Sequence, residues 1–268
     1  MNPISAHVLV FDSGVGGLSI VSHLREMLPA ISLTYLADNQ FFPYGMMHEQ
    51  ALTERVLKLL TSAQQRYQPD LIVIACNSAS TLVLPPLREK LATPIVGVVP
   101  AIKPAAQLSA SKVIGLLATP GTIRRDYTDD LINEFAPGCE VIRVGSSHLV
   151  QVVEESLRGI QHPPAVFEEI VTPFLESGHI AQLDTIVLAC THFPLVTAQL
   201  AQVLPSVSHW IDSGEAIARR VRQLLTERDC KTAPVGNRAL LTGSESDLAS
   251  MRQNFARFGF TDIAQFEN

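Results

Sequence analysis

Two cysteines stand at matched places in two similar stretches of the sequence. Residues 70–77 read Asp-Leu-Ile-Val-Ile-Ala-Cys-Asn, and residues 184–191 read Asp-Thr-Ile-Val-Leu-Ala-Cys-Thr. Each stretch opens on Asp, continues with apolar residues and reaches Cys76 or Cys190 at its seventh place. A free thiol has an ordinary pKa of about 8.5, so it can release and take up a proton near neutral pH. The pattern therefore indicates two thiols that could serve as acid and base.

A matched pair of cysteines could also be two small core residues, because free cysteine is among the most buried residue types. The polar neighbours Asn77 and Thr191-His192 favour a functional pair instead. Neither disulfide nor zinc chemistry fits, since the spacing is not Cys-x-x-Cys and no other Cys/His pair has ligand spacing. Two equivalent thiols suit a racemase, which takes a proton from one face of a carbon and delivers one to the other. Cys139 and Cys230 lack such neighbours and are interpreted as structural.

Short apolar runs alternate with helical patterns along the chain. The predicted strands are residues 8–11, 34–37, 71–76, 95–98, 113–118, 141–144, 185–190, 209–211 and 239–242. Most are continuous apolar runs, which is typical of parallel strands covered on both faces. The predicted helices are residues 18–28, 48–67, 85–91, 122–135, 149–157, 194–204, 215–226 and 245–258. The alternation predicts an α/β protein with largely parallel sheets flanked by helices, whose ligands bind at the carboxyl ends of strands.

The repeated segment predicts two similar domains. The two cysteines are 190 − 76 = 114 positions apart, and a weaker match pairs residues 10–14 with residues 117–121, placing Asp12-Ser13 opposite Thr119-Pro120. We expect two pseudo-two-fold related domains with the active site in the cleft between them. The first would comprise residues 1–98 plus 210–268, and the second residues 99–209.

Composition narrows the class of protein. The 268 residues carry 20 Lys+Arg against 26 Asp+Glu, a formal net charge of −6, which argues against a nucleic-acid partner. No apolar run approaches the roughly 18 residues of a membrane span, and the N-terminus lacks the pattern of a signal peptide. Four cysteines are too few for a disulfide scaffold. We therefore expect a cytoplasmic protein with free thiols and no membrane partner.

Five motifs occur in order along the chain. They are Phe-Asp-Ser-Gly-Val-Gly-Gly-Leu at 11–18, Phe-Pro-Tyr-Gly at 42–45, Ala-Cys-Asn-Ser-Ala at 75–79, Gly-Val-Val-Pro-Ala-Ile at 97–102 and Cys-Thr-His-Phe-Pro-Leu at 190–195. Together they resemble the glutamate racemases, cofactor-independent enzymes that make D-glutamate for bacterial peptidoglycan. The resemblance implies L- and D-glutamate as substrates, and neither cofactor nor metal. It also allows a homodimer and, as in some members of the family, activation by a peptidoglycan precursor.

The resemblance also implies residue roles. Cys76 would act on the α-proton of D-glutamate and Cys190 on that of L-glutamate. Asp12, His192 and Glu154 would assist catalysis, although Glu155 is adjacent and leaves the last assignment open. The residues implied to bind substrate are Asp12, Ser13, Tyr44, Gly45, Asn77, Ser78, Thr119, Thr191 and His192. Hydroxyls and backbone N–H groups suit the carboxylates of glutamate, and Asp12 suits its ammonium group.

The chain departs from the family pattern at three places. Ser78 stands where Thr is more usual, which keeps the hydroxyl, and Ala189 stands where Gly is common. Phe41-Phe42 precedes the Pro-Tyr-Gly motif where polar residues are often found, which would alter the rim of the cleft.

Other classes of protein fit the sequence less well. A dinucleotide enzyme could use Gly14-Val-Gly16-Gly17 and Asp38, but Ser19 occupies the place of the third glycine and Asp12 would repel a pyrophosphate. Pyridoxal phosphate is disfavoured because none of the five lysines lies in a strand-end motif. A secreted binding protein for acidic amino acids would need a signal peptide. The alternative that stays open is an aspartate racemase or another cofactor-independent racemase of the same superfamily, although aspartate enzymes usually have Glu after Cys-Thr.

Overall fold

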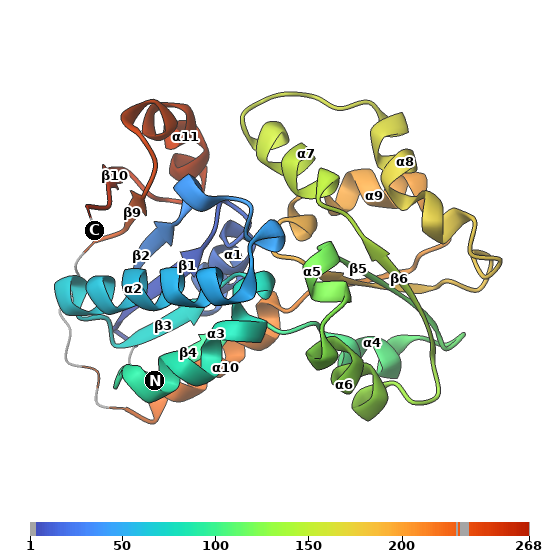
Figure 1. Cartoon of the computed structure of the whole chain (residues 1–268), viewed down its shortest axis with the longest axis horizontal. Helices are drawn as coiled ribbons and strands as arrows, with labels where there is room; N and C mark the ends of the chain where they lie inside the picture. The colour runs from blue at the N-terminus through green and yellow to red at the C-terminus, as the bar shows by residue number, and fades with distance from the viewer. Residues whose placement is uncertain (1–3, 229, 231–235, 268) are drawn as a thin grey trace. The chain divides into compact units, whose positions relative to one another are not determined.

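The chain forms two compact units, each built on its own parallel sheet (Figure 1). The computed structural model describes residues 4–228, 230 and 236–267. Unit 1 comprises residues 1–98 with 214–268, and unit 2 comprises residues 99–213. Among the residues described, no helix combines the length and the apolar character needed to cross a bilayer.

Unit 1 has, within its described residues, a six-stranded parallel sheet in the order β10-β9-β2-β1-β3-β4. The strands are β1 (His7–Asp12), β2 (Ser32–Ala37), β3 (Leu71–Ile74), β4 (Ile95–Gly97), β9 (Arg238–Leu241) and β10 (Asp262–Gln265). The helices are α1 (Leu18–Met27), α2 (Glu49–Tyr67), α3 (Asn77–Lys90), α10 (Gly214–Thr226) and α11 (Glu245–Arg257), with short 3₁₀ turns η1 (Asn39–Phe41) and η2 (Tyr44–Met46).

The central strands of unit 1 are mostly apolar because helices cover both faces of the sheet. Leu9 and Phe11 of β1 pack in one core cluster with Leu59 of α2 and Val83 of α3. Side chains alternate along a strand, so the neighbouring β1 residues face the opposite side, where α1 packs against α10. All six residues of β1 are buried as a result.

Unit 2 has, in the part of the chain that is described, a four-stranded parallel sheet in the order β6-β5-β7-β8. The strands are β5 (Val113–Ala118), β6 (Glu140–Gly145), β7 (Thr185–Ala189) and β8 (His209–Ile211). The helices are α4 (Ile102–Leu108), α5 (Pro120–Ile123), α6 (Asp126–Phe135), α7 (His148–Leu157), α8 (Pro164–Leu175) and α9 (Thr197–Val203), with the turn η3 (Phe193–Val196). Ile102 of α4 and Ile132 of α6 share one core cluster with Leu116 and Val187 of the sheet.

The strand order explains the repeated segment. The order β2-β1-β3-β4 in unit 1 matches β6-β5-β7-β8 in unit 2, so the two cysteines follow equivalent strands, β3 and β7. The Asp that opens each repeat ties its strand to the beginning of the neighbouring one. Asp70 accepts a hydrogen bond from the backbone N–H of His7 at 2.8 Å, and Asp184 accepts from the N–H groups of Ala110 and Ser111, both at 2.9 Å.

Asp184 should make a pH-dependent contribution to stability. Its partial burial would raise the pKa of Asp184, but hydrogen bonds from Ser111, Ser109 and Thr185 outweigh burial and lower it to about 2 from 3.8. A depressed folded-state pKa means that the stabilisation is complete above the unfolded value and is lost as the pH falls toward the folded value. Asp184→Asn is therefore expected to lower the melting temperature at pH 7, with the difference from the parent shrinking between about pH 4 and pH 2.

The matched control for Asp184 is Asp130→Asn, because Asp130 is an exposed carboxylate of the same unit. This change is expected to leave the melting temperature almost unaltered at every pH. A constant difference between Asp184→Asn and the parent down to pH 2 would contradict the ionic origin of the effect.

The predicted strands all form, but several elements differ from the prediction. The predicted helix 85–91 begins instead at Asn77 and contains Pro85 and Pro86 in its interior. Two prolines normally mark a helix start, yet buried Ala79, Val83 and Leu87 hold this helix on the sheet despite the lost hydrogen bonds. The predicted helix 122–135 is two helices, α5 and α6, separated at Arg124 and Arg125.

Three elements were not predicted. Helices α4 and α8 each contain a proline, Pro104 and Pro173, which weakens a helical pattern in sequence. Helix α8 nevertheless buries Phe167, Ile170, Val171 and Phe174, at the spacing of one helical face. Strand β10 pairs with β9 at the edge of the sheet. Only Ile263 of its four residues is buried, so the sequence has no apolar run there that would predict a strand.

Candidate functional site

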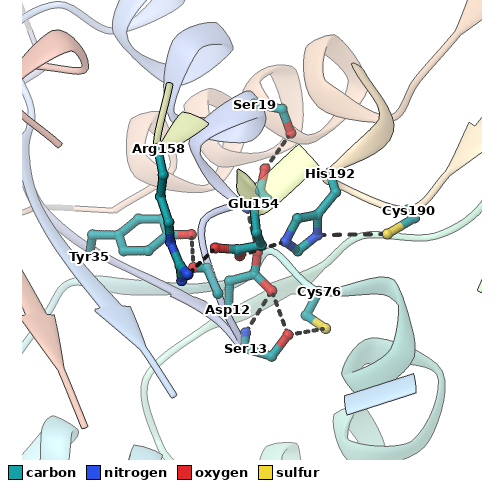
Figure 2. Close-up of polar contacts among 12 residues, drawn as sticks. Asp12, Ser13, Ser19, Tyr35, Cys76, Glu154, Arg158, Cys190 and His192 are labelled. Carbon is teal, nitrogen blue, oxygen red and sulfur yellow. Dashed lines mark hydrogen bonds and ion pairs between the residues drawn. The ribbon is translucent and has the colours of Figure 1, made fainter. Parts of the chain in front are cut away.

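Cys76 lies at the end of β3, directly before helix α3. Its backbone is extended, it occupies the N-cap position of the helix, and its side chain is 6% exposed. The Ser13 hydroxyl oxygen, which follows β1, lies 3.9 Å from the Cys76 sulfur and 3.4 Å from Oδ1 of Asp12 (Figure 2). The N-terminus of a helix carries partial positive charge, which stabilises a thiolate placed there. The N-terminus of α3 is thus positioned to stabilise negative charge on the Cys76 sulfur.

The Asp12 carboxylate organises the loop after β1. Its Oδ1 accepts a hydrogen bond from Ser13 N at 2.6 Å, and its Oδ2 accepts one from Gly17 N. Tyr35 donates its hydroxyl to the Gly14 carbonyl at 2.8 Å. A Cβ at Gly17 would lie 2.9 Å from the Tyr35 hydroxyl and 3.0 Å from the Ala75 side chain, so the loop requires glycine there. The glycine-rich motif therefore packs tightly around a carboxylate, which does not suit it to hold a pyrophosphate.

The turn at Tyr44 and Gly45 presents backbone groups rather than a hydroxyl. Tyr44 is 1% exposed, its ring packs near Phe11, and its hydroxyl donates to Oδ2 of Asp38 at 2.5 Å. Within the described residues, the N–H groups of Tyr44 and Gly45 donate to no acceptor. Two adjacent N–H groups without a protein acceptor are suited to donate hydrogen bonds to a carboxylate.

Helix α3 brings two more of the predicted residues beside Cys76. Asn77 and Ser78 form its first turn, and each is 4% exposed. Among the described residues, Nδ2 of Asn77 is buried and donates to no acceptor. An unsatisfied amide donor is costly to bury, which favours a ligand oxygen at this position. These residues, with Asp12, Ser13, Tyr44, Gly45 and Cys76, are called the unit 1 cluster.

The second cysteine is part of a chain of three buried side chains. Nδ1 of His192 lies 3.8 Å from the Cys190 sulfur, and Nε2 lies 3.0 Å from Oε1 of Glu154 (Figure 2). The exposed fractions are 6% for Cys190, 3% for His192 and 4% for Glu154. Arg158, one helical turn after Glu154, lies 3.8 Å from its other carboxylate oxygen. The imidazole therefore bridges a thiol and a carboxylate away from bulk water.

The charge of His192 follows from its neighbours. Burial alone would lower the pKa of His192, but its hydrogen bonds and charge interactions with Cys190 and Glu154 raise it well above the ordinary 6.5. These two neighbours therefore favour the protonated form of the imidazole. A protonated imidazole beside the sulfur stabilises negative charge on it, and it can pass a proton to it.

The structure separates the two adjacent glutamates of α7. Glu154 is buried and contacts His192, whereas Glu155 is half-buried and pairs with His162 at 3.2 Å. The carboxylate that reaches the unit 2 histidine is therefore Glu154. Its neighbour Glu155 makes a separate contact with His162.

Two threonines complete the predicted set. Thr119 directly follows β5, and its hydroxyl oxygen caps α5 by accepting from Thr122 N at 3.4 Å. Thr191 is 5% exposed and directly follows Cys190. Thr119, Glu154, Cys190, Thr191 and His192 are called the unit 2 cluster. All predicted site residues thus belong to one of the two clusters. Most lie at or just beyond the carboxyl ends of strands, whereas Tyr44 and Gly45 come from η2 and Glu154 comes from α7.

Sequence reasoning missed a group of polar residues around Asp38. Asp38 and Thr242 directly follow β2 and β9, so the strand-end rule could have found both. Arg55, which pairs with Asp38 at 2.7 Å, lies on α2, where no pattern in the sequence distinguishes it from a solvent-facing arginine. Among the described residues, no group of three or more His, Cys, Asp or Glu side chains is arranged to hold a metal ion.

Both the sequence and the fold of this chain are similar to those of known proteins. The family model described as "Asp/Glu/Hydantoin racemase" matches residues 16–221. The glutamate racemase of Shewanella loihica is 45% identical over 265 residues, 99% of this chain and 97% of that protein. The one from Klebsiella pneumoniae is 47% identical over 258 residues, 96% of this chain and 90% of that protein.

A solved structure extends the agreement to the fold. The crystal structure of Escherichia coli glutamate racemase, in complex with L-glutamate and the activator UDP-MurNAc-Ala, matches with a TM-score of 0.93 at 44% sequence identity. The match covers 98% of each chain. With this agreement in sequence and fold, the chain belongs to the Asp/Glu/hydantoin racemase family.

Proposed function

We propose that this chain is a glutamate racemase that moves the α-proton of glutamate between two thiols, Cys76 and Cys190. The observation that carries the proposal is the matched placement of these cysteines after equivalent strands, each with polar partners. Relatives that are 45% and 47% identical over nearly the whole chain are glutamate racemases, which supports glutamate as the substrate.

The reaction needs one thiolate and one thiol at a time. In the direction from L- to D-glutamate, the Cys190 thiolate takes the α-proton and its S–H bond forms as the C–H bond breaks. The electron pair left on the α-carbon then takes the proton of the Cys76 thiol, which becomes the thiolate. The reverse direction exchanges the two roles. After each turnover Cys190 is a thiol and Cys76 a thiolate, so both must exchange protons with solvent before another L-glutamate can react.

The two clusters offer distinct partners for the charged groups of glutamate. The N–H groups of Tyr44 and Gly45, the Asn77 amide and the N-terminus of α3 are suited to carboxylates. Asp12 is suited to the ammonium group. His192, whose pKa is raised by its neighbours, and the helix N-terminus at Cys76 are suited to stabilise thiolates, which a weakly acidic α-proton requires.

Racemisation in deuterated water tests the proposal. Each enantiomer is incubated separately, and the α-position of product and of recovered substrate is analysed by NMR early in the reaction. We expect product that carries deuterium and substrate that stays largely unlabelled, because the thiol that delivers the proton has exchanged with solvent. Label appearing in recovered substrate as fast as in product would mean that a single base serves both faces, and would overturn the two-thiol mechanism.

L-Aspartate is the control for substrate class. It is one methylene shorter than L-glutamate, and a difference of this size typically changes kcat/KM by about 10- to 200-fold. We expect L-glutamate to be preferred by such a factor. A preference for L-aspartate would replace the proposal with the aspartate racemase alternative.

We extend the proposal to an activator: a ligand like the one bound to the E. coli relative would also activate this chain. That relative, 44% identical, was crystallised with the activator UDP-MurNAc-Ala. Adding this nucleotide to the glutamate assay measures whether kcat/KM of this chain responds to it.

A further inference from the structure

Asp38 is a fully buried carboxylate at the end of β2, with four donors around it. Its Oδ2 accepts hydrogen bonds from the Tyr44 hydroxyl at 2.5 Å and from Nε of Arg55 at 3.0 Å. Its Oδ1 accepts from Nη2 of Arg55 at 2.7 Å and from the Thr242 hydroxyl at 2.6 Å. Asp38, Tyr44, Arg55 and Thr242 are called the Asp38 clamp. The side chain of Asp38 is 0% exposed, so these hydrogen bonds replace those that water would make to the carboxylate.

The clamp joins four segments of unit 1 that are distant in sequence. Asp38 follows β2, Tyr44 belongs to η2, Arg55 to α2, and Thr242 follows β9. Backbone bonds reinforce the junction, since Gln40 N donates to the Thr242 hydroxyl at 3.2 Å and Gly243 N donates to Oδ1 of Asn39 at 2.9 Å. The segment from residue 38 to residue 47 is therefore anchored to both α2 and β9.

The charges of the clamp are mutually dependent. Arg55 is the cation that balances buried Asp38, and it also stacks on the Phe41 ring at 4.2 Å. Hydrogen bonding to Asp38 raises the pKa of Arg55, and burial together with the Asp38 charge raises the pKa of Tyr44 well above its usual 10. The tyrosine is therefore a fixed donor to Asp38. A buried ion pair of this kind depends on its full set of hydrogen bonds, because each lost donor leaves charge uncompensated.

The clamp determines what the turn at residues 43–46 can present. The Tyr44 hydroxyl is occupied by Asp38 and its ring packs near Phe11, one residue before Asp12. The Tyr44 side chain thus holds the turn in place. Among the described residues, the groups of the turn left without an acceptor are the N–H groups of Tyr44 and Gly45. Where these N–H groups point depends on how Asp38 holds the tyrosine.

We propose that Asp38 is a positioning residue for substrate binding, which acts through Tyr44, Arg55 and Thr242 to fix the backbone N–H groups of Tyr44 and Gly45. The role rests on the proposed glutamate racemase function, in which those groups receive a carboxylate. Asp38 itself touches no substrate, so its effect is on affinity for the carboxylate and only weakly on proton transfer.

A matched pair of threonine variants tests the proposal. Thr242→Val removes one donor of the clamp, whereas Thr34→Val removes a buried hydroxyl that lies 2.8 Å from Nε2 of His7 in the same sheet. Thr242 is 8% exposed and Thr34 is 0% exposed, so both changes delete a buried hydrogen bond with little change in volume. We expect Thr242→Val to raise KM for L-glutamate about three- to tenfold, as when a bond to a charged group is weakened, with kcat within about twofold. Thr34→Val is expected to lower the melting temperature and leave KM unchanged.

A rescue series at Arg55 separates positioning from general damage. Arg55→Met removes the cation that balances Asp38, and Arg55→Lys restores the charge without the two-pronged bond. We expect KM to increase in the order parent, Arg55→Lys, Arg55→Met. Equal KM values in the two variants, with only their melting temperatures different, would overturn the positioning role.

Amide hydrogen exchange gives a readout that does not depend on glutamate. Exchange at residues 39–47 is expected to be faster in Thr242→Val and Arg55→Met than in the parent or in Thr34→Val. If the parent fails to racemise glutamate, the proposed function is wrong, and this readout still decides whether the clamp holds the turn. Unchanged exchange in Thr242→Val, or an active Thr242→Val with the KM of the parent, would overturn the inference.

Discussion

Alanine in place of either Cys76 or Cys190 is expected to reduce racemisation by about 10²- to 10⁴-fold or more, the cost of losing a general acid or base. Each direction of the reaction uses one thiol to remove a proton and the other to deliver one, so both variants should lose both directions. The two enantiomers have equal free energy in water, which requires kcat/KM to be equal in the two directions for every variant. Circular dichroism with each enantiomer as substrate measures both values.

Cys139→Ala is the matched control for this experiment. Cys139 is a half-buried thiol in unit 2 that packs against the core cluster beneath the sheet, outside the unit 2 cluster. Its removal should lower stability slightly and leave kcat/KM within about twofold, as is usual away from functional groups. Near-parental activity in Cys76→Ala or Cys190→Ala would contradict the two-thiol mechanism. The repeat would then reflect only the shared strand order of the two units.

The elements that carry the site were predictable because buried strands have a recognisable sequence pattern. Strands β1, β3, β5 and β7 are covered on both faces, so they read as continuous apolar runs. The polar residues at or just beyond the carboxyl ends of these strands, such as Asp12 and Cys76, then stand out as candidates for chemistry. Strand β10 escaped detection for the opposite reason, since it is an edge strand with one buried residue.

The partners that hold the site were less predictable. Glu154 could not be separated from Glu155 by sequence, because the distinction depends on which face of α7 is buried. The support of Tyr44 by Asp38 and Arg55 depends on contacts between segments that are far apart in the chain. Sequence identified the tyrosine but favoured no role for its hydroxyl over its backbone, whereas the structure shows that the hydroxyl is already bonded.

Glu154→Gln is expected to reduce kcat/KM for both enantiomers by about tenfold or more, and His192→Gln by about 10²-fold, as for an acid–base partner. The carboxylate of Glu154 is one of the groups that raise the pKa of His192, and the imidazole in turn faces the Cys190 sulfur. Glutamine keeps the size of the glutamate side chain but removes its charge. The loss should therefore appear as a change in how His192 titrates, beyond the change in rate.

The pH profile of kcat/KM distinguishes this role from simple support. Removing the Glu154 charge removes an influence that raises the pKa of His192, so the imidazole should lose its proton at a lower pH than in the parent. If protonated His192 is the active form, the alkaline limb of the profile moves to lower pH in Glu154→Gln. Its acidic limb should stay where it is.

The adjacent pair of residues provides the control for this prediction. Glu155 and His162 form a histidine–carboxylate contact of 3.2 Å in the same unit, close to the 3.0 Å between Glu154 and His192, but without a cysteine beside it. Glu155→Gln should therefore leave both kcat/KM and the alkaline limb unchanged. An equal loss in Glu154→Gln and Glu155→Gln would show that the effect arises from the charge of α7 as a whole. An unshifted alkaline limb in Glu154→Gln would show that Glu154 does not act through His192.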